Sequence, residues 1–329
     1  MQELPIENAL TAIARWDEAR RREILVAISN PDTVAALISL AANLSRPDER
    51  IVALKVVTVV GGTPLATAQS HANVSRRFRD ILQVATKRGA EAGVRVETVL
   101  QAAHVAAQGI VEVAASRPAT RLLLLGWHGP LARGHLGASV CRDVIRTAPC
   151  DVAIFLDRGL GSAVGRILVP AAGGPHARLG LRLACDLAGG EASRLDVLRV
   201  ARPGRATDVA AHKRAVEKLI RDELGDEPRG TVTARVVQSP SVLSGILDAS
   251  SDGYDLMIVG ASEEGALHNW LFGSIPDTLA ERAPCSVLLV HKREPASVSR
   301  IRRAVKRLLR PSKPALANRH GRCRRRRCS

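Results

Sequence analysis

The stretch Leu256-Met-Ile-Val-Gly260 decides the fold, because an earlier stretch, Leu122-Leu-Leu-Leu-Gly126, has the same pattern. Two further landmarks recur in the same order and at a nearly constant offset. Ile24-Leu-Val-Ala-Ile28 returns as Ile167-Leu-Val-Pro-Ala171, and Thr147-Ala-Pro-Cys-Asp-Val152 returns as Arg282-Ala-Pro-Cys-Ser-Val287. Self-similarity of this kind predicts a repeated architecture. We expect an N-terminal helical extension (1–22), domain 1 (23–158), a linker (159–165), domain 2 (166–293) and a basic tail (294–329).

Within each repeat, short apolar runs alternate with longer segments of helical periodicity. Short, continuously apolar runs are typical of parallel strands that are buried on both faces. We therefore predict an α/β fold with two doubly wound, Rossmann-like domains in tandem, each with a five-stranded parallel sheet. The expected strands are 24–28, 51–57, 94–99, 122–126 and 152–156, then 167–171, 195–200, 232–237, 256–260 and 286–291. The helices expected in domain 2 are 177–187, 208–224, 241–249 and 275–282.

The net charge of +16 suggests a nucleic acid or an acidic membrane as partner, but it is unevenly placed. Residues 296–329 hold 13 Lys or Arg and no acid, so the two domains are close to neutral. Aromatic residues make up only 2% of the chain, which disfavours a nucleic-acid surface built on base stacking. No apolar run reaches the length of a membrane span or a signal peptide, so we expect a cytoplasmic protein. Its six cysteines are expected to be reduced and mostly buried.

A loop that contains glycine follows the fourth expected strand of each repeat. In domain 2 this loop starts at Gly260 and ends at Gly273-Ser274, where a helix opens. Glycine lets a backbone approach a ligand closely, and a helix N-terminus with a serine cap can bind an anion. The alternative is a plain capped helix without a ligand. In domain 1 the corresponding residues are Gly126, Gly129 and Ser139.

These features resemble the universal stress protein family, in a tandem two-domain form that covers about residues 23–293. Family members that bind ATP carry Gly, two residues, Gly, nine residues and then Gly-Ser or Gly-Thr after the fourth strand. The residues that match are Gly260, Gly273 and Ser274 in domain 2, and Gly126, Gly129 and Ser139 in domain 1. The Ala-Pro-Cys segments that end at Cys150 and Cys285 also resemble the family. The resemblance implies ATP or another adenine nucleotide as ligand, without a metal.

Both domains depart from the nucleotide-binding pattern. In domain 2, Glu263 replaces the second glycine, and Glu263 and Glu264 put two negative charges where phosphates would lie. In domain 1 the spacing is one residue short and Ala138 replaces the late glycine, but His128, Arg133 and His135 give a loop that suits an anion better. Relatives that bind ATP have a carboxylate after the first strand, where this chain has Ser29 and Ala172. If one domain binds a nucleotide, we expect it to be domain 1.

The sequence holds no recognisable set of catalytic residues, so we expect a protein that is not an enzyme. His176 and His268 could approach each other near the domain 2 loop, without an assigned role. The resemblance implies that the two domains pair through their fifth strands, or that the chain forms a homodimer. The leading hypothesis is a stress-response or regulatory protein that binds an adenine nucleotide. The alternative is an interaction module, without nucleotide, that regulates a membrane transporter or derives from one.

The basic tail allows several interpretations. Ile301, Val305, Leu308 and Leu309 share one face of an expected helix whose other faces are basic. Such a helix can lie on an anionic membrane or bind an acidic partner such as a transporter segment, and residues 296–329 would then hold the protein peripherally at the membrane. It can equally pack its apolar face on domain 2. Binding of nucleic acid through the tail is a third hypothesis, which the scarcity of aromatic residues disfavours.

Overall fold

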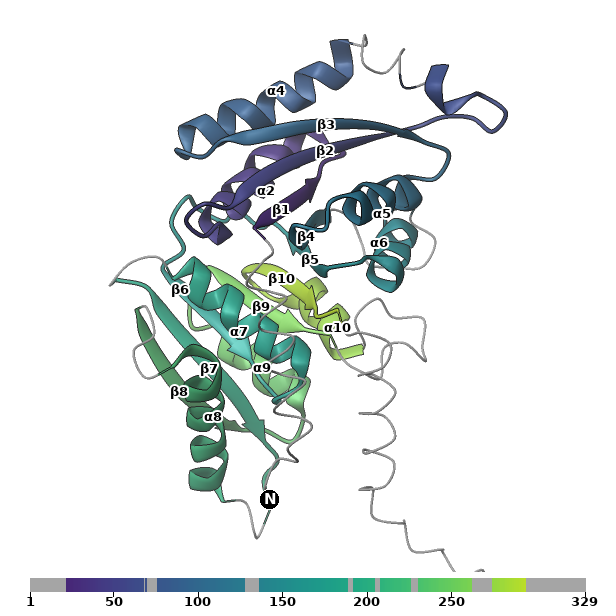
Figure 1. Ribbon diagram of the computed structural model, residues 1–329. Coiled ribbons are helices and arrows are strands. Elements are labelled where there is room, and N and C mark those ends of the chain that lie inside the picture. Colours follow the sequence, from purple (N-terminus) through teal and green to yellow (C-terminus); the bar gives the residue numbers. More distant parts are fainter. Residues whose placement is uncertain are drawn as a thin grey trace, which may run out of the picture. The chain divides into compact units, whose positions relative to one another are not determined.

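The computed structural model describes residues 22–67, 69, 76–127, 136–188, 192–204, 208–225, 230–261 and 274–293. These residues alternate strands and helices in both halves of the chain, as Figure 1 shows. The elements of domain 1 are β1 (Glu23–Ala27), α2 (Pro31–Leu44), β2 (Arg50–Thr58), α4 (Arg76–Glu91), β3 (Val96–Ala103), α5 (Ala106–Ser116), β4 (Thr120–Trp127), α6 (Leu136–Thr147) and β5 (Asp151–Leu156). Those of domain 2 are β6 (Arg166–Pro170), α7 (Pro175–Leu187), β7 (Arg194–Ala201), α8 (Val209–Leu224), β8 (Thr231–Gln238), α9 (Val242–Ser250), β9 (Leu256–Gly260), α10 (Ser274–Arg282) and β10 (Ser286–His291).

All ten strands form one continuous sheet, in the order β3-β2-β1-β4-β5-β10-β9-β6-β7-β8. Each domain contributes five parallel strands, and the two halves join where β10 pairs with β5 in the antiparallel direction, with Val287 opposite Leu156 and His291 opposite Val152. The predicted doubly wound domains are confirmed, and the expected pairing of the fifth strands is present within the chain. Because the join is antiparallel, the C-terminal ends of the strands of the two domains lie at opposite edges of the sheet.

The predicted strands agree with the structure except at β3, which was expected at 94–99 and runs from Val96 to Ala103. The difference has a local cause. Gly93 has a positive φ of 73°, and the N–H of Val94 donates to the carbonyl of Gly89, so the turn that closes α4 uses Val94. The strand then continues further than expected because its ladder with β2 extends to Ala103 opposite Thr58.

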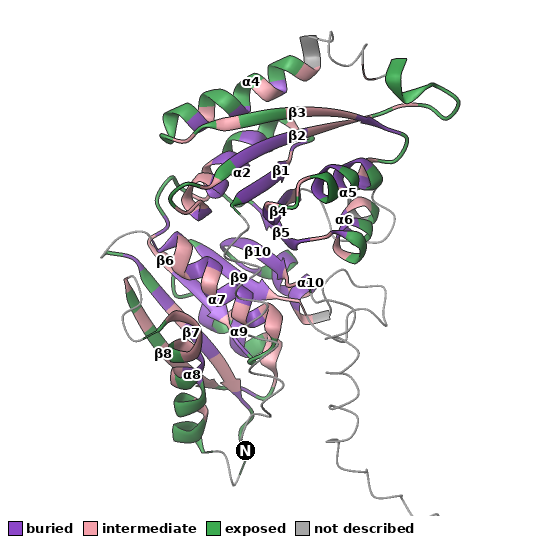
Figure 2. Ribbon diagram, in the orientation of Figure 1, coloured by how far each residue is buried: buried purple, intermediate pink, exposed green. Residues whose placement is uncertain are grey.

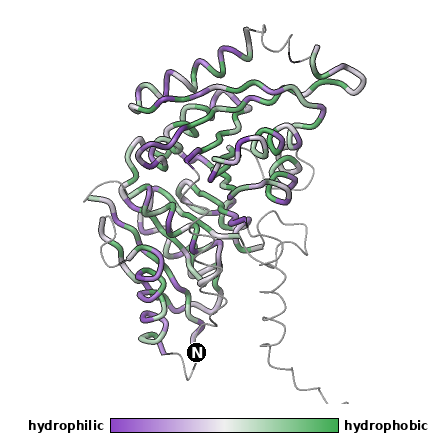
Figure 3. The backbone as a smooth tube through the Cα atoms, in the orientation of Figure 1, coloured by the Kyte–Doolittle hydropathy of each residue, from purple (hydrophilic) through white to green (hydrophobic). Residues whose placement is uncertain are grey.

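The apolar side chains form two layers, one on each face of the sheet. One layer lies under α2, α4, α7 and α8, and the other lies under α5, α6, α9 and α10. The central strands are buried along their whole length, while α4 and α8 expose much of their surface (Figure 2). The same strands are the most continuously hydrophobic part of the backbone in Figure 3. This pattern explains why short runs such as Ile24-Leu-Val and Leu122-Leu-Leu-Leu predicted strands that are covered on both sides.

Several predictions lie outside the described residues: the N-terminal extension before Arg22, the basic tail from residue 294, and Cys323 and Cys328. The linker has no helix or strand between Leu156 and Arg166, and Gly159 has a positive φ of 88°. Within the described ranges, no helix is both long enough and apolar enough to cross a membrane. Cys141, Cys150 and Cys285 are buried and not bonded to one another, and burial raises the pKa of the Cys141 thiol to about 12.

Candidate functional site

The C-terminal edge of domain 1 carries a cation beside the end of β1. The Nζ atom of Lys55, on β2, donates a hydrogen bond of 3.0 Å to the carbonyl of Ser29. Asn30 caps α2 by accepting from the N–H of Asp32 at 3.1 Å. Where nucleotide-binding relatives are expected to have a carboxylate, this edge therefore holds a serine backbone and an ammonium group. The charge at this point is positive, whereas a carboxylate would make it negative. A positive charge favours an anion over a nucleoside hydroxyl as the bound group.

Two of the three residues predicted for a nucleotide in domain 1 are described. Gly126 is partly buried near the end of β4, and Ser139 is exposed in the first turn of α6. Gly129 lies outside the described residues, as do His128, Arg133 and His135. The first turn of α6 contains no acidic residue. The positive end of its helix dipole is therefore not neutralised by a carboxylate from that turn.

The corresponding helix of domain 2 differs in this respect. Ser274 is the first residue of α10, Gly273 and the rest of the loop from residue 262 lie outside the described residues, and nothing is described of the Ser274 side chain. Asp277 lies in the first turn of α10 and is 3% exposed. A carboxylate there occupies the positive end of the helix and disfavours an added phosphate. The starts of the two helices thus differ in charge, and the choice of domain 1 as the nucleotide site stays a prediction.

Gly260 has a packing role that sequence reasoning missed. A Cβ atom at this position would lie 2.7 Å from the backbone nitrogen of Ala177 and 2.8 Å from the carbonyl carbon of His176. The first turn of α7 therefore packs directly on the end of β9, and only glycine leaves room for it. At Gly126 the nearest atom to an added Cβ would be Cδ1 of Leu37, at 2.9 Å, which is the end of a side chain. The two corresponding glycines are thus under different constraints.

The first turn of α7 also brings two histidines together at the end of β10. The ring of His176 stacks on the ring of His291, with 4.7 Å between centroids, and its Nδ1 atom accepts from the N–H of Lys292 at 2.9 Å. His268, which the sequence suggested as the neighbour of His176, lies outside the described residues. Burial lowers the pKa of His291 below its ordinary value. No sequence signal predicts this pair, because His176 and His291 share no motif.

The buried His291 predicts how stability depends on pH. Because its pKa is lower in the folded state, the unfolded chain takes up this proton first as the pH falls below about 6.5. We expect the free energy of unfolding to fall between pH 7.5 and pH 5 on this account. The ring of His176 stacks on His291, and the next two residues of the chain, Lys292 and Arg293, both contact Asp151. Urea unfolding of His291→Gln should show a smaller loss than the parent chain.

His104→Gln, at an exposed position just after β3, is the control for that measurement. It should follow the pH dependence of the parent chain. If His291→Gln and His104→Gln behave alike, His291 does not produce the expected loss.

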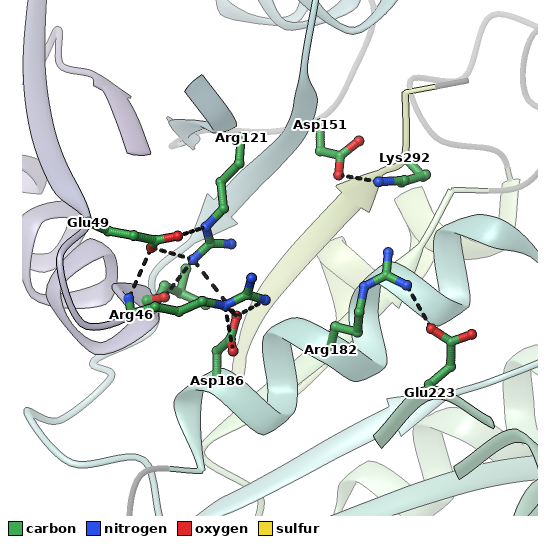
Figure 4. Close-up of polar contacts among 9 residues, drawn as sticks. Arg46, Glu49, Arg121, Asp151, Arg182, Asp186, Glu223 and Lys292 are labelled. Carbon is green, nitrogen blue, oxygen red and sulfur yellow. Dashed lines mark hydrogen bonds and ion pairs between the residues drawn. The ribbon is translucent and has the colours of Figure 1, made fainter. Parts of the chain in front are cut away.

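The junction of the two domains is held by a cluster of charged side chains (Figure 4). Arg121, at the start of β4, donates to both oxygens of Glu49 at 2.6 and 2.9 Å and to the carbonyl of Leu44 at 2.7 Å. The side chains of Arg121 and Glu49 are 5% and 3% exposed. Arg46 makes a two-pronged contact of 3.0–3.2 Å with Asp186 at the end of α7, which also lies 3.8 Å from Arg121. The cluster joins the end of α2, the turn between α2 and β2, and the start of β4 in domain 1 to α7 of domain 2.

The ends of the β5–β10 pair carry two related sets of contacts. Arg293 donates from its backbone to Asp151 at 2.8 Å and from its side chain to the carbonyl of Pro149. Arg158, at the corresponding place after β5, donates from its backbone to Ser286 at 2.9 Å and from its side chain to the carbonyl of Cys285. The sets differ in charge. Lys292 forms an ion pair of 2.9 Å with Asp151 (Figure 4), whereas Asp157 lies 3.4 Å from the hydroxyl of Ser286.

Comparison with known proteins identifies the class to which this fold belongs. The model of the universal stress protein family matches the chain twice, at residues 20–155 and 164–291. The chain belongs to the universal stress protein family and carries two of its domains in tandem. A search among curated protein sequences finds no match.

Solved structures show the same fold over most of the chain. A universal stress protein from Archaeoglobus fulgidus DSM 4304 is similar with a TM-score of 0.62 and 16% identity, over 84% of this chain and 98% of that one. The cytoplasmic domain of a prokaryotic cation chloride cotransporter is similar with a TM-score of 0.53 and 14% identity, over 83% of this chain and 96% of that one. At these identities the similarity concerns the fold alone, and it extends over both halves of the chain.

Proposed function

We propose that this protein is a cytoplasmic stress-response or regulatory protein that binds an adenine nucleotide through domain 1 and does not catalyse a reaction. The observation that carries the proposal is the difference between the two helix starts. The first turn of α6 has no acid, whereas that of α10 holds Asp277. Lys55, near the end of β1, adds a positive charge to the domain 1 edge. The nucleotide would contact Gly126, Gly129 and Ser139, with its phosphates towards the N-terminus of α6.

Calorimetry with ATP, ADP and AMP on the full chain tests this proposal. We expect binding by the parent protein, and binding weakened about three- to tenfold in Ser139→Ala, because one hydrogen bond to a phosphate is lost. Ser274→Ala, the corresponding change in domain 2, is the control and should bind as the parent does. Mass spectrometry of the purified protein should detect a co-purified nucleotide. An absence of heat with all three nucleotides at high protein concentration would contradict the proposal.

One observation favours a second candidate, an interaction module that regulates a membrane transporter. The fold covers 96% of the cytoplasmic domain of a cation chloride cotransporter. In this candidate the altered nucleotide loops would reflect a role in binding a partner, and residues 296–329 would contact an anionic membrane or the transporter. Failure of all three nucleotides in calorimetry would favour this candidate over the first.

A further inference from the structure

A small pocket of about 190 Å³ lies in domain 2 where α7, α8 and β7 meet beside Gly173. Its polar wall consists of three cations and one carboxylate: Arg178, Arg199, Lys218 and Asp222. Val216 and Leu219 of α8 form an apolar wall. Gly173, which follows β6, has a positive φ of 97°, so the chain turns sharply at the rim. The pocket thus combines an excess of positive charge with a small apolar surface.

The contacts around the pocket hold its cations in place without neutralising all of them. Arg178 pairs with Glu223, whose side chain is 3% exposed, and Lys218 pairs with Asp222 at 2.7 Å. Arg199 donates from Nε to Nδ1 of His212 at 3.1 Å. This contact orients Arg199 without placing a carboxylate beside it that would cancel its charge. Among the described residues, no other hydrogen bond engages the Arg199 guanidinium, whose terminal nitrogens remain available as donors.

The matching surface of domain 1 shows that the fold does not require this cluster. Arg178 and Arg182 occupy the positions on α7 that Ala35 and Ser39 occupy on α2, when the buried positions of the two helices are aligned. In domain 1 the contact between α2 and α4 is made instead by Ser39 and Arg88, at 2.7 Å. Lys55 takes the place of Arg199, and its ammonium group bonds to the main chain at Ser29. The cluster is therefore a property of domain 2 alone and not a requirement of the fold that the two domains share.

We propose that this pocket binds a doubly charged oxyanion of the phosphate type, either free phosphate or the phosphate of a small monoester. Guanidinium groups match the spacing of phosphate oxygens and bind them by charge-assisted hydrogen bonds. Arg199 supplies the main pair of donors, and Arg178 and Lys218 supply the remaining positive charge. The wall formed by Val216 and Leu219 accommodates the small organic group of a monoester. The site is distinct from the nucleotide site proposed in domain 1 and uses none of its residues.

Titration of the full chain with inorganic phosphate at pH 8, in a buffer free of other polyvalent anions, tests the proposal by calorimetry. We expect saturable binding at one site, weakened at least tenfold in Arg199→Gln. Arg214→Gln, a change to an exposed cation on α8 that does not line the pocket, is the control and should bind phosphate as the parent does. The basic tail is identical in all variants, so any phosphate that it binds contributes equally to each titration.

A second variant covers the case in which Arg199→Gln unfolds. The Lys218 side chain is largely exposed, so Lys218→Gln should fold normally and still weaken phosphate binding by several-fold. Unchanged binding in the folded variants would overturn the proposal and show that the phosphate binds elsewhere on the chain. Arg199→Gln should lose phosphate binding and keep normal nucleotide binding, whereas Ser139→Ala should weaken nucleotide binding and keep normal phosphate binding. This pattern would separate this proposal from the one for domain 1.

Discussion

Replacing Arg121 by methionine should lower the free energy of unfolding by about 3–5 kcal/mol, the largest effect that we expect of a single substitution here. The change leaves the carboxylate of Glu49 buried without its cationic partner, and it removes the hydrogen bond to the carbonyl of Leu44. The backbone N–H of Arg46 still donates to Glu49 but does not neutralise it. Urea unfolding monitored by circular dichroism measures the loss.

A double-mutant cycle separates the ion pair from simple packing. Glu49→Leu alone should also destabilise strongly, because it leaves the guanidinium of Arg121 buried. The double variant Arg121→Met/Glu49→Leu should recover a large part of the stability, since an apolar pair of similar volume replaces a buried ion pair at little cost. If the two single losses simply add in the double variant, the interaction between Arg121 and Glu49 does not contribute to the free energy of unfolding.

Gly260→Ala should destabilise the protein by about 2–3 kcal/mol, whereas Gly126→Ala should cost less than about 1.5 kcal/mol. At Gly260 the new methyl group meets backbone atoms of His176 and Ala177, so the start of α7 must move. At Gly126 it meets the end of the Leu37 side chain, which can rotate away. Thermal unfolding of both variants, measured side by side, gives the comparison.

The two glycines occupy the same place in the two repeats, so each is the control for the other. Equal losses would mean that the close approach of α7 to β9 is not what requires glycine at position 260. A loss of stability confined to Gly126→Ala would mean that Gly126, and not Gly260, is the more tightly packed of the two glycines.

The fold could be predicted because its signals are local. Stretches such as Leu122-Leu-Leu-Leu-Gly126 are continuously apolar, and their recurrence in the same order gave the two repeats. The boundary of β3 was less predictable, because the turn at Gly93 depends on a hydrogen bond from Val94 to the end of α4. Pairing of β5 with β10 followed only from the family resemblance, since no local pattern in the strands themselves identifies a partner.

The contacts of the candidate sites were mostly beyond sequence reasoning. Gly260 was expected to make room for a ligand, and the structure shows that it makes room for α7. Arg121 and Glu49 are 72 residues apart, and Arg46 and Asp186 are 140 residues apart, without any motif to connect them. The pocket in domain 2 also combines side chains from two helices and a strand. Such groups come together only through tertiary packing, which single-sequence periodicity does not describe.

The unequal charges at the ends of the β5–β10 pair favour association of domain 1 with domain 2 over association of two copies of the same domain. If two copies of domain 1 met through β5, Asp157 of each would face Asp151 of the other, and two pairs of like charges would oppose the dimer. Two copies of domain 2 would bring Lys292 to Ser286 and lose the ion pair. Only the mixed combination has Lys292 beside Asp151. The short connection from Leu156 to Arg166 keeps that partner at high effective concentration, so β5 pairs with β10 of the same chain rather than with a strand of a second molecule.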